Sequence, residues 1–95
     1  MSIAKANKRV VCSDGFSISI QASSFNYCSP REDDAVAYKS VELGFPNRPD
    51  PFILAYAEEQ GNWTGTVYGY VPASLVKKMI AGHGGIIEGE CPPLV

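Results

Sequence analysis

The chain has 95 residues, of which 45% are hydrophobic and 19% are charged, and its formal net charge is −2. This balance indicates one globular domain with a modest core, and it is not the balance of a disordered chain. Lysine and arginine are few and scattered, which argues against nucleic acid as a partner, and ten carboxylates are too few for a mimic of DNA.

No apolar run approaches the roughly 20 residues that a membrane-spanning helix needs, so we expect no membrane partner. Residues 1–8 form a basic lead-in without the apolar stretch of a secretory signal, and we expect it to be flexible, ahead of a single domain at residues 9–95. The three cysteines have no repeated spacing, which argues against a disulfide scaffold and favours reduced thiols in a cytoplasm.

The first half of the chain predicts three strands. Residues 9–12 form a short apolar run, and the Ser-Asp-Gly sequence at 13–15 is a hairpin signal. Residues 16–21 alternate between apolar and polar side chains, which predicts a half-buried antiparallel strand. Residues 22–35 are a long irregular stretch of the kind that often carries function, and residues 36–45 return to strand character.

The second half predicts two more strands and one helix. The strands are expected at residues 52–57 and 64–71, and the helix at 73–81. The glycine-rich residues 82–85 provide a helix stop, and one short edge strand fits in residues 86–95 before two prolines end it. The expected apolar stripe of the helix consists of Leu75, Val76, Met79 and Ile80. The sequence therefore predicts an α+β fold, with an antiparallel sheet of about five strands and one C-terminal helix packed on one face.

Two tyrosines are expected on the sheet face that the helix leaves uncovered. Regular alternation places Tyr68 and Tyr70 on one face of their strand and Val67 and Val71 on the other. Exposed tyrosine offers a large contact area with a polar tip, which suits recognition of a partner. The alternative is that these rings pack across neighbouring strands for stability alone, and the sequence leaves both interpretations open.

A catalytic site would have to use Cys28, Arg31 and His83. Arg31 lies close enough in sequence to favour a thiolate at Cys28, but three acidic residues follow it, and His83 is the only histidine. We therefore expect no enzyme, with Cys28 packed as a small hydrophobic residue. One histidine and no paired cysteines also predict no metal site, and no cofactor motif is present.

Several short segments resemble a family of small proteins encoded by phages and bacterial prophages. They are residues 27–31, 41–46, 56–58, 67–72 and 83–85. The resemblance implies a compact phage accessory protein in the cytoplasm of a bacterial host, and it carries no assigned activity. Small accessory proteins of this kind often inhibit a host protein, as anti-CRISPR and other anti-defence factors do, and this step is an analogy of context and size.

The leading hypothesis is a module that binds a host or phage protein through Tyr27, Arg31, Tyr68 and Tyr70. Tyrosine and arginine are enriched at binding hot spots, and the acidic residues 32–34 would steer a basic partner toward this surface. Self-association into a homodimer through the same face is the competing use of the surface. Two further alternatives are a small-ligand binder or enzyme using Cys28, Arg31 and His83, and a structural component of the virion.

Overall fold

In the computed structural model of the protein, which describes residues 6–95, one helix packs across a five-stranded antiparallel sheet. The strands are β1 (Val10–Cys12), β2 (Ser17–Gln21), β3 (Ser40–Gly44), β4 (Val67–Pro72) and β5 (Ile86–Glu88), and the helix is α1 (Ala73–Gly82). Their order in the sheet is β4-β3-β2-β1-β5. The α+β prediction is therefore confirmed.

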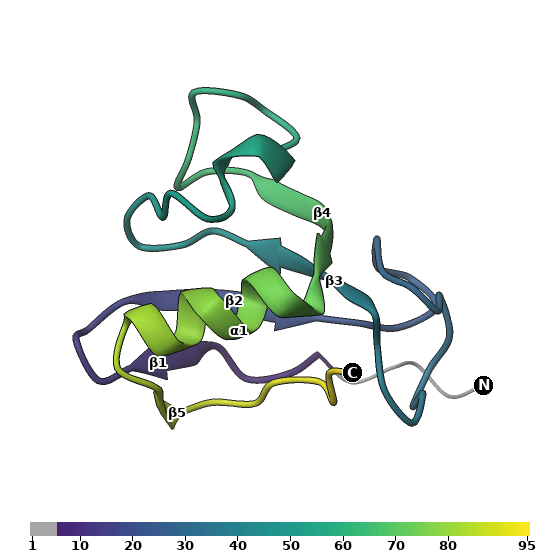
Figure 1. Ribbon diagram of the computed structural model, residues 1–95. Coiled ribbons are helices and arrows are strands. Elements are labelled where there is room, and N and C mark those ends of the chain that lie inside the picture. Colours follow the sequence, from purple (N-terminus) through teal and green to yellow (C-terminus); the bar gives the residue numbers. More distant parts are fainter. Residues whose placement is uncertain (1–5) are drawn as a thin grey trace.

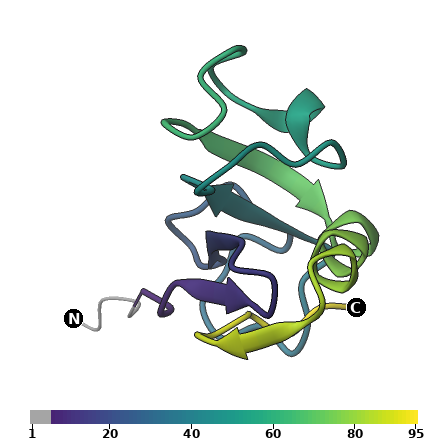
Figure 2. The same cartoon turned by 90° about the vertical axis from the view of Figure 1, so that its left-hand side faces the viewer.

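Helix α1 connects the two opposite edges of the sheet. It follows β4 directly, runs across one sheet face in front of β2 and β1, and leads into β5 (Figure 1). A view turned by 90° shows that α1 lies to one side of the sheet (Figure 2). The helix ends as the glycines at 82–85 predict, because the amides of Gly84 and Gly85 bond to the carbonyls of Ala81 and Ile80.

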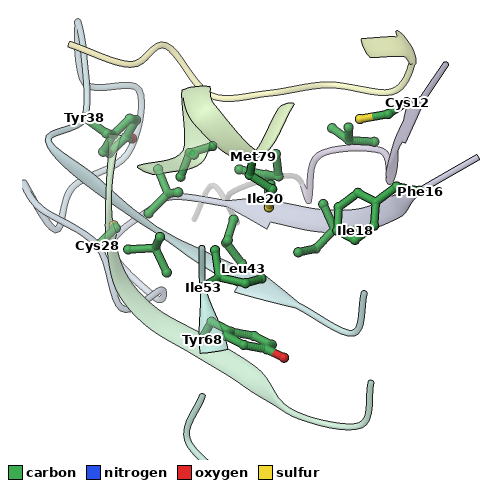
Figure 3. Packing of buried hydrophobic residues seen from close by; sticks show 14 of the residues in the cluster. Cys12, Phe16, Ile18, Ile20, Cys28, Tyr38, Leu43, Ile53, Tyr68 and Met79 are labelled. Carbon is green, nitrogen blue, oxygen red and sulfur yellow. The ribbon is translucent and has the colours of Figure 1, made fainter. Parts of the chain in front are cut away.

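The core lies between α1 and the sheet. The alternation predicted for β2 is confirmed, because Phe16, Ile18 and Ile20 are fully buried while Ser17 and Ser19 face the other side. Val76 and Met79 of α1 are also fully buried, whereas Leu75 and Ile80 are only partly buried at the margins of the helix stripe. The labelled core side chains come from the sheet, from α1 and from the loops between the strands (Figure 3).

The strand predicted at residues 52–57 is wrong. This segment contains a short 3₁₀ helix, η1 (Leu54–Tyr56), with Ile53 buried in the core. Asp50 turns the chain by accepting a hydrogen bond from the amide of Phe52, which prevents an extended start. Only Ala57, which bridges to Tyr68, pairs with the sheet. The five strands are completed instead by β5, at the position of the predicted short edge strand.

The described part of the N-terminal lead-in is attached to the domain. The amide of Asn7 donates to the side chain of Gln21, and the amide of Lys8 donates to Glu90. These bonds make Asn7 and Lys8 part of the domain's hydrogen-bond network, and the flexibility of the lead-in at residues 1–8 stays a prediction. The rest of the predicted lead-in, residues 1–5, lies outside the described residues.

Candidate functional site

Tyr27 and Tyr70 stack on each other at the surface. Their ring centroids are 5.8 Å apart with an interplanar angle of 28°. Both residues are exposed, at 41% and 50% of their full area. The amide of Tyr70 also donates to the carbonyl of Tyr27, so the two residues are joined through both backbone and side chains. Tyr70 belongs to β4 and Tyr27 to the loop between β2 and β3, which brings distant parts of the sequence together.

Arg31 extends this pair into a three-residue surface. Its guanidinium carbon lies 5.5 Å from the centroid of the Tyr27 ring, which is the geometry of a cation–π contact. Arg31 is itself exposed. We call Tyr27, Arg31 and Tyr70 the Tyr27–Tyr70 surface. Three of the four side chains predicted to bind a partner therefore lie together.

Glu42 of β3 holds the backbone of Tyr27 in position through its carboxylate. The amide of Tyr27 donates to Glu42 Oε1 at 2.9 Å, and the side-chain amide of Asn26 donates to Glu42 Oε2 at 3.4 Å. Glu42 lies between the buried residues Val41 and Leu43, so its side chain leaves the sheet on the face opposite the core. The Tyr27–Tyr70 surface therefore lies on the sheet face that α1 does not cover.

The loop that carries Tyr27 and Arg31 is ordered by its own polar side chains. Asp33 accepts hydrogen bonds from the amide and hydroxyl of Ser24, and the hydroxyl of Ser23 donates to Asn26. The buried Tyr38 fixes the far end of the loop by donating its hydroxyl to the carbonyl of Glu32 at 2.7 Å. The irregular stretch at 22–35 is thus a hydrogen-bonded scaffold for the exposed rings.

A β-bulge in β4 gives Tyr70 its exposed position. Val41 pairs with Val71 and Leu43 pairs with Tyr68, so Gly69 and Tyr70 together face the single residue Glu42. Tyr70 has a φ of 53°, a left-handed conformation that is unusual for an aromatic residue. Gly69 lies close under Tyr27, because a Cβ at Gly69 would come within 3.3 Å of the Tyr27 Cβ atom.

The same bulge makes the prediction for Tyr68 wrong. Tyr68 has no exposed area and lies in the core rather than beside Tyr70 (Figure 3). The extra residue of the bulge reverses the alternation, so Tyr68 and Val71 both face inward. The hydroxyl of Tyr68 donates to the carbonyl of Trp63 at 2.5 Å, and burial, followed by the charge of Asp50, raises the pKa of this hydroxyl. Tyr68 is therefore a structural residue.

Cys28 and His83, the residues of the alternative catalytic reading, make their hydrogen bonds to different groups. The Cys28 thiol is buried and donates to the carbonyl of Ser23, and burial raises its pKa despite the opposing influence of that hydrogen bond and of Arg31. Both ring nitrogens of His83 lie 2.7 Å from aspartate oxygens. In this arrangement His83 has no free ring nitrogen with which to take a proton from Cys28.

The partners of His83 are Asp14 and Asp50, and no pattern in the sequence connects either aspartate with it. Asp14 occupies the predicted turn at 13–15, and Asp50 lies between Pro49 and Pro51. Their separation from His83 along the chain leaves no spacing signal. Within residues 6–95, no group of three or more histidine, cysteine, aspartate or glutamate side chains is arranged to hold a metal ion.

Helix α1 has ten residues, and no helix within residues 6–95 is long and apolar enough to cross a membrane. No protein-family model, no curated protein and no solved structure matches the chain. Tyr27, Arg31 and Tyr70 therefore form the candidate functional surface by their own contacts.

Proposed function

We propose that the protein is a binding module that attaches to another protein through the Tyr27–Tyr70 surface. The observation that carries this proposal is the stack of Tyr27 on Tyr70 with Arg31 over the Tyr27 ring, all three exposed. Tyrosine and arginine dominate binding hot spots, because they bury much area and keep hydrogen-bonding tips. Tyrosine rings that serve stability alone are buried in a core, whereas the rings of Tyr27 and Tyr70 leave a large part of their area in water.

The order of this surface supports binding further. Association costs free energy for every side chain and loop that must be immobilised. Here Glu42 already holds the amide of Tyr27, and the backbone of Tyr70 is bonded to Tyr27. Little ordering is left for the moment of binding, so more of the contact energy remains as affinity.

The surrounding charge favours a basic protein as the partner. Glu32 and Asp34 are exposed in the same loop as Arg31, and the Glu58 carboxylate lies beside Gly69, where a Cβ would meet it at 3.1 Å. Complementary charge speeds association more than it raises affinity, and the effect weakens with salt. We infer a partner that combines a groove for the two rings with lysine or arginine around it.

For the biological setting we propose a phage or prophage accessory protein that acts in the cytoplasm of a bacterial host. The support for this part is the sequence resemblance of the five short segments described above, together with the small size of the chain. In this setting the partner is a host or phage protein. Inhibition of a host defence protein, of the anti-CRISPR or another anti-defence type, is the mode of action that fits a small chain with a pre-ordered binding surface.

The test is site-specific photo-crosslinking in a bacterial lysate. A photoreactive phenylalanine analogue replaces Tyr27 or Tyr70, one at a time, and also Ile87 as a control. Ile87 is 64% exposed in β5, at the opposite edge of the sheet from β4, and so matches the others in exposure. We expect one and the same protein to be crosslinked from positions 27 and 70 and not from position 87.

The crosslinked protein is then purified, and its affinity for the parent chain is compared with its affinity for Tyr70→Ala and Ile87→Ala. We expect Tyr70→Ala to weaken binding by about 30-fold or more, the effect of a hot-spot residue, and Ile87→Ala to change it little. The proposal fails if all three positions crosslink equally, or if Tyr70→Ala folds and binds with parental affinity.

A further inference from the structure

His83 lies between two carboxylates at the C-terminal end of α1. Its Nδ1 atom is 2.7 Å from Asp14 Oδ2, and its Nε2 atom is 2.7 Å from Asp50 Oδ2. A carboxylate only accepts hydrogen bonds, whereas a neutral imidazole has one N–H and one bare nitrogen. Both contacts are satisfied together when His83 carries two N–H groups, that is, when the ring is positively charged.

The surroundings of the ring are suited to a charged state. Phe16 stacks on His83 with centroids 3.9 Å apart and an interplanar angle of 5°. Arg48 donates to Asp14 Oδ2 at 2.8 Å, and its guanidinium carbon lies 5.9 Å from the Phe16 ring centroid. Two cations and two anions therefore balance when His83 is protonated, and one negative charge is left over when it is not. We call Asp14, Phe16, Arg48, Asp50 and His83 the His83 cluster.

The two aspartates attach different segments to the end of α1. The turn of Asp14 has further bonds to this region, because the amides of Ser13 and Asp14 donate to the carbonyls of Gly85 and His83. The loop of residues 48–52 is bonded to His83 through the side chain of Asp50. Asp50 is only 3% exposed, and its Oδ1 atom accepts the amide of Phe52 at 2.9 Å.

Both ends of this loop are fixed independently of His83. At one end the side chain of Asn47 accepts from the amide of Ser17 and donates to the carbonyl of Gly15. At the other end Ile53 is fully buried in the core. The part between them, residues 48–52, can therefore loosen without unfolding the domain.

We propose that the His83 cluster is a pH-operated latch, which holds the loop of residues 48–52 against the end of α1 while His83 is protonated and releases it when His83 loses its proton. On deprotonation one proton goes to solvent, and a bare ring nitrogen then faces a carboxylate. The neutral ring has one N–H for two carboxylates, so the bonds to Asp14 and Asp50 can no longer both form, and the hold on the loop through Asp50 weakens. Arg48 stays bonded to Asp14 and remains the fixed start of the loop. This latch is separate from the Tyr27–Tyr70 surface and does not depend on the function proposed for it.

The pKa of His83 agrees with this geometry. Burial alone lowers it, but the hydrogen bonds to Asp14 and Asp50, followed by their charges, outweigh burial, so the pKa is raised above its ordinary value. A raised pKa in the closed state means that closure is fully favoured below the pKa of the open state. Closure is then lost as pH rises through the pKa of the closed state.

The experiment follows the wild-type protein by NMR between pH 5 and pH 9. The ring signals of His83 give its pKa, and hydrogen exchange gives the protection of the Phe52 and Ile53 amides, corrected for the intrinsic effect of pH. We expect His83 to titrate above about 6.5, the value of an ordinary histidine. Protection of the two amides should fall by up to about tenfold per pH unit in the titration range, while the β2–β3 amides stay protected.

Asp50→Asn is the matched variant. Its amide oxygen can still accept from Phe52, and its NH₂ group can donate to neutral His83, so the loop should stay protected at the alkaline end of this pH range, where the wild-type loop is released. The latch is disproved if wild-type protection of Phe52 and Ile53 does not change as His83 titrates, or if His83 titrates below its ordinary value. Loss of protection with rising pH in Asp50→Asn, equal to that in the wild type, would disprove it as well.

Discussion

Tyr68 and Val71 lie three positions apart in β4, and both side chains point to the same face of the sheet. Regular alternation would place them on opposite faces. The bulge at Gly69 and Tyr70 supplies the extra residue that brings both into the core, and it turns Tyr70 outward against Tyr27. The core at this edge and the proposed binding surface are thus two products of the same backbone irregularity.

The left-handed backbone of Tyr70 leads to the first prediction. Tyr70→Gly and Tyr70→Ala both remove the ring, but only glycine adopts a φ of 53° without steric cost. We expect Tyr70→Gly to be the more stable variant by about 1 kcal/mol in urea denaturation. Within a regular strand the order is reversed, so a more stable alanine variant would mean that Tyr70 is not left-handed.

The second prediction separates the two tyrosines of β4. Tyr68→Ala should lower the free energy of unfolding by about 3–5 kcal/mol, because it leaves a large cavity in the core. Tyr68→Phe leaves the carbonyl of Trp63 without its partner and should cost about 1–2 kcal/mol. Tyr70→Phe is the control on the exposed side and should leave stability nearly unchanged. Equal effects of the two phenylalanine variants would contradict the different burial of the two residues.

The third prediction concerns the stripe of α1. Met79 is fully buried and Leu75 only partly, although the sequence placed both on the same stripe. Met79→Ala should therefore cost about 2–5 kcal/mol, and Leu75→Ala about 1–2 kcal/mol. Thermal unfolding of both variants measures this difference, and a larger loss for Leu75→Ala would show that α1 is rotated about its axis.

The fourth prediction is a maximum of global stability at intermediate pH. The raised pKa of His83 gives a contribution that is complete below its unfolded value and is lost as pH rises through the folded value. The pKa of Asp14 is lowered, first by its hydrogen bond with His83 and then by the amide of Phe16, so its contribution is lost as pH falls through the folded value. Urea denaturation measures the free energy of unfolding at each pH. This free energy should fall less at alkaline pH in His83→Gln than in the wild type, and less at acid pH in Asp14→Asn. A His83→Gln variant with an unchanged fall at alkaline pH would contradict the assignment.

The fifth prediction concerns the thiols. Cys12 and Cys28 are buried, whereas Cys91 is partly exposed, and burial raises the pKa of all three. In the folded protein a thiol reagent should therefore modify Cys91 first and the other two only on unfolding. Cys28→Ser should still capture the partner that is crosslinked at Tyr27. Loss of capture by a folded Cys28→Ser variant would support a chemical role for this thiol.

Much of the fold could be predicted because local patterns agreed with the tertiary structure. The alternation from Phe16 to Gln21 matches a strand with one buried face, and the stripe and glycine stop of α1 match the observed helix. The apolar run at 52–57 led to the wrong prediction of a strand, because a short apolar segment fits a strand or a helix turn equally well. The turn at Asp50 and the burial of Ile53 decided between them.

The candidate site could be predicted only in part. Residue type alone indicated Tyr27, Arg31 and Tyr70, because exposed aromatic and arginine side chains suit binding. The side chain of Tyr68 points into the core because of the bulge opposite Glu42, and no local sequence pattern predicts this bulge. The pairing of His83 with Asp14 and Asp50 depends on the path of the whole chain, since each aspartate lies in a turn where that residue type is common.

The path of α1 from β4 to β5 affects how the protein is made in the cell. A nascent chain that has not reached residue 86 has β2 on one side of β1 and no strand on the other, so this edge of its sheet is open to pairing with other chains. Tyr38 likewise has to wait for Pro93 and Val95, whose backbones bond to it on either side of residue 94. The sheet therefore gains its last strand only after residues 86–88 have been made, and until then the outer edge of β1 is a place where a growing chain can pair wrongly.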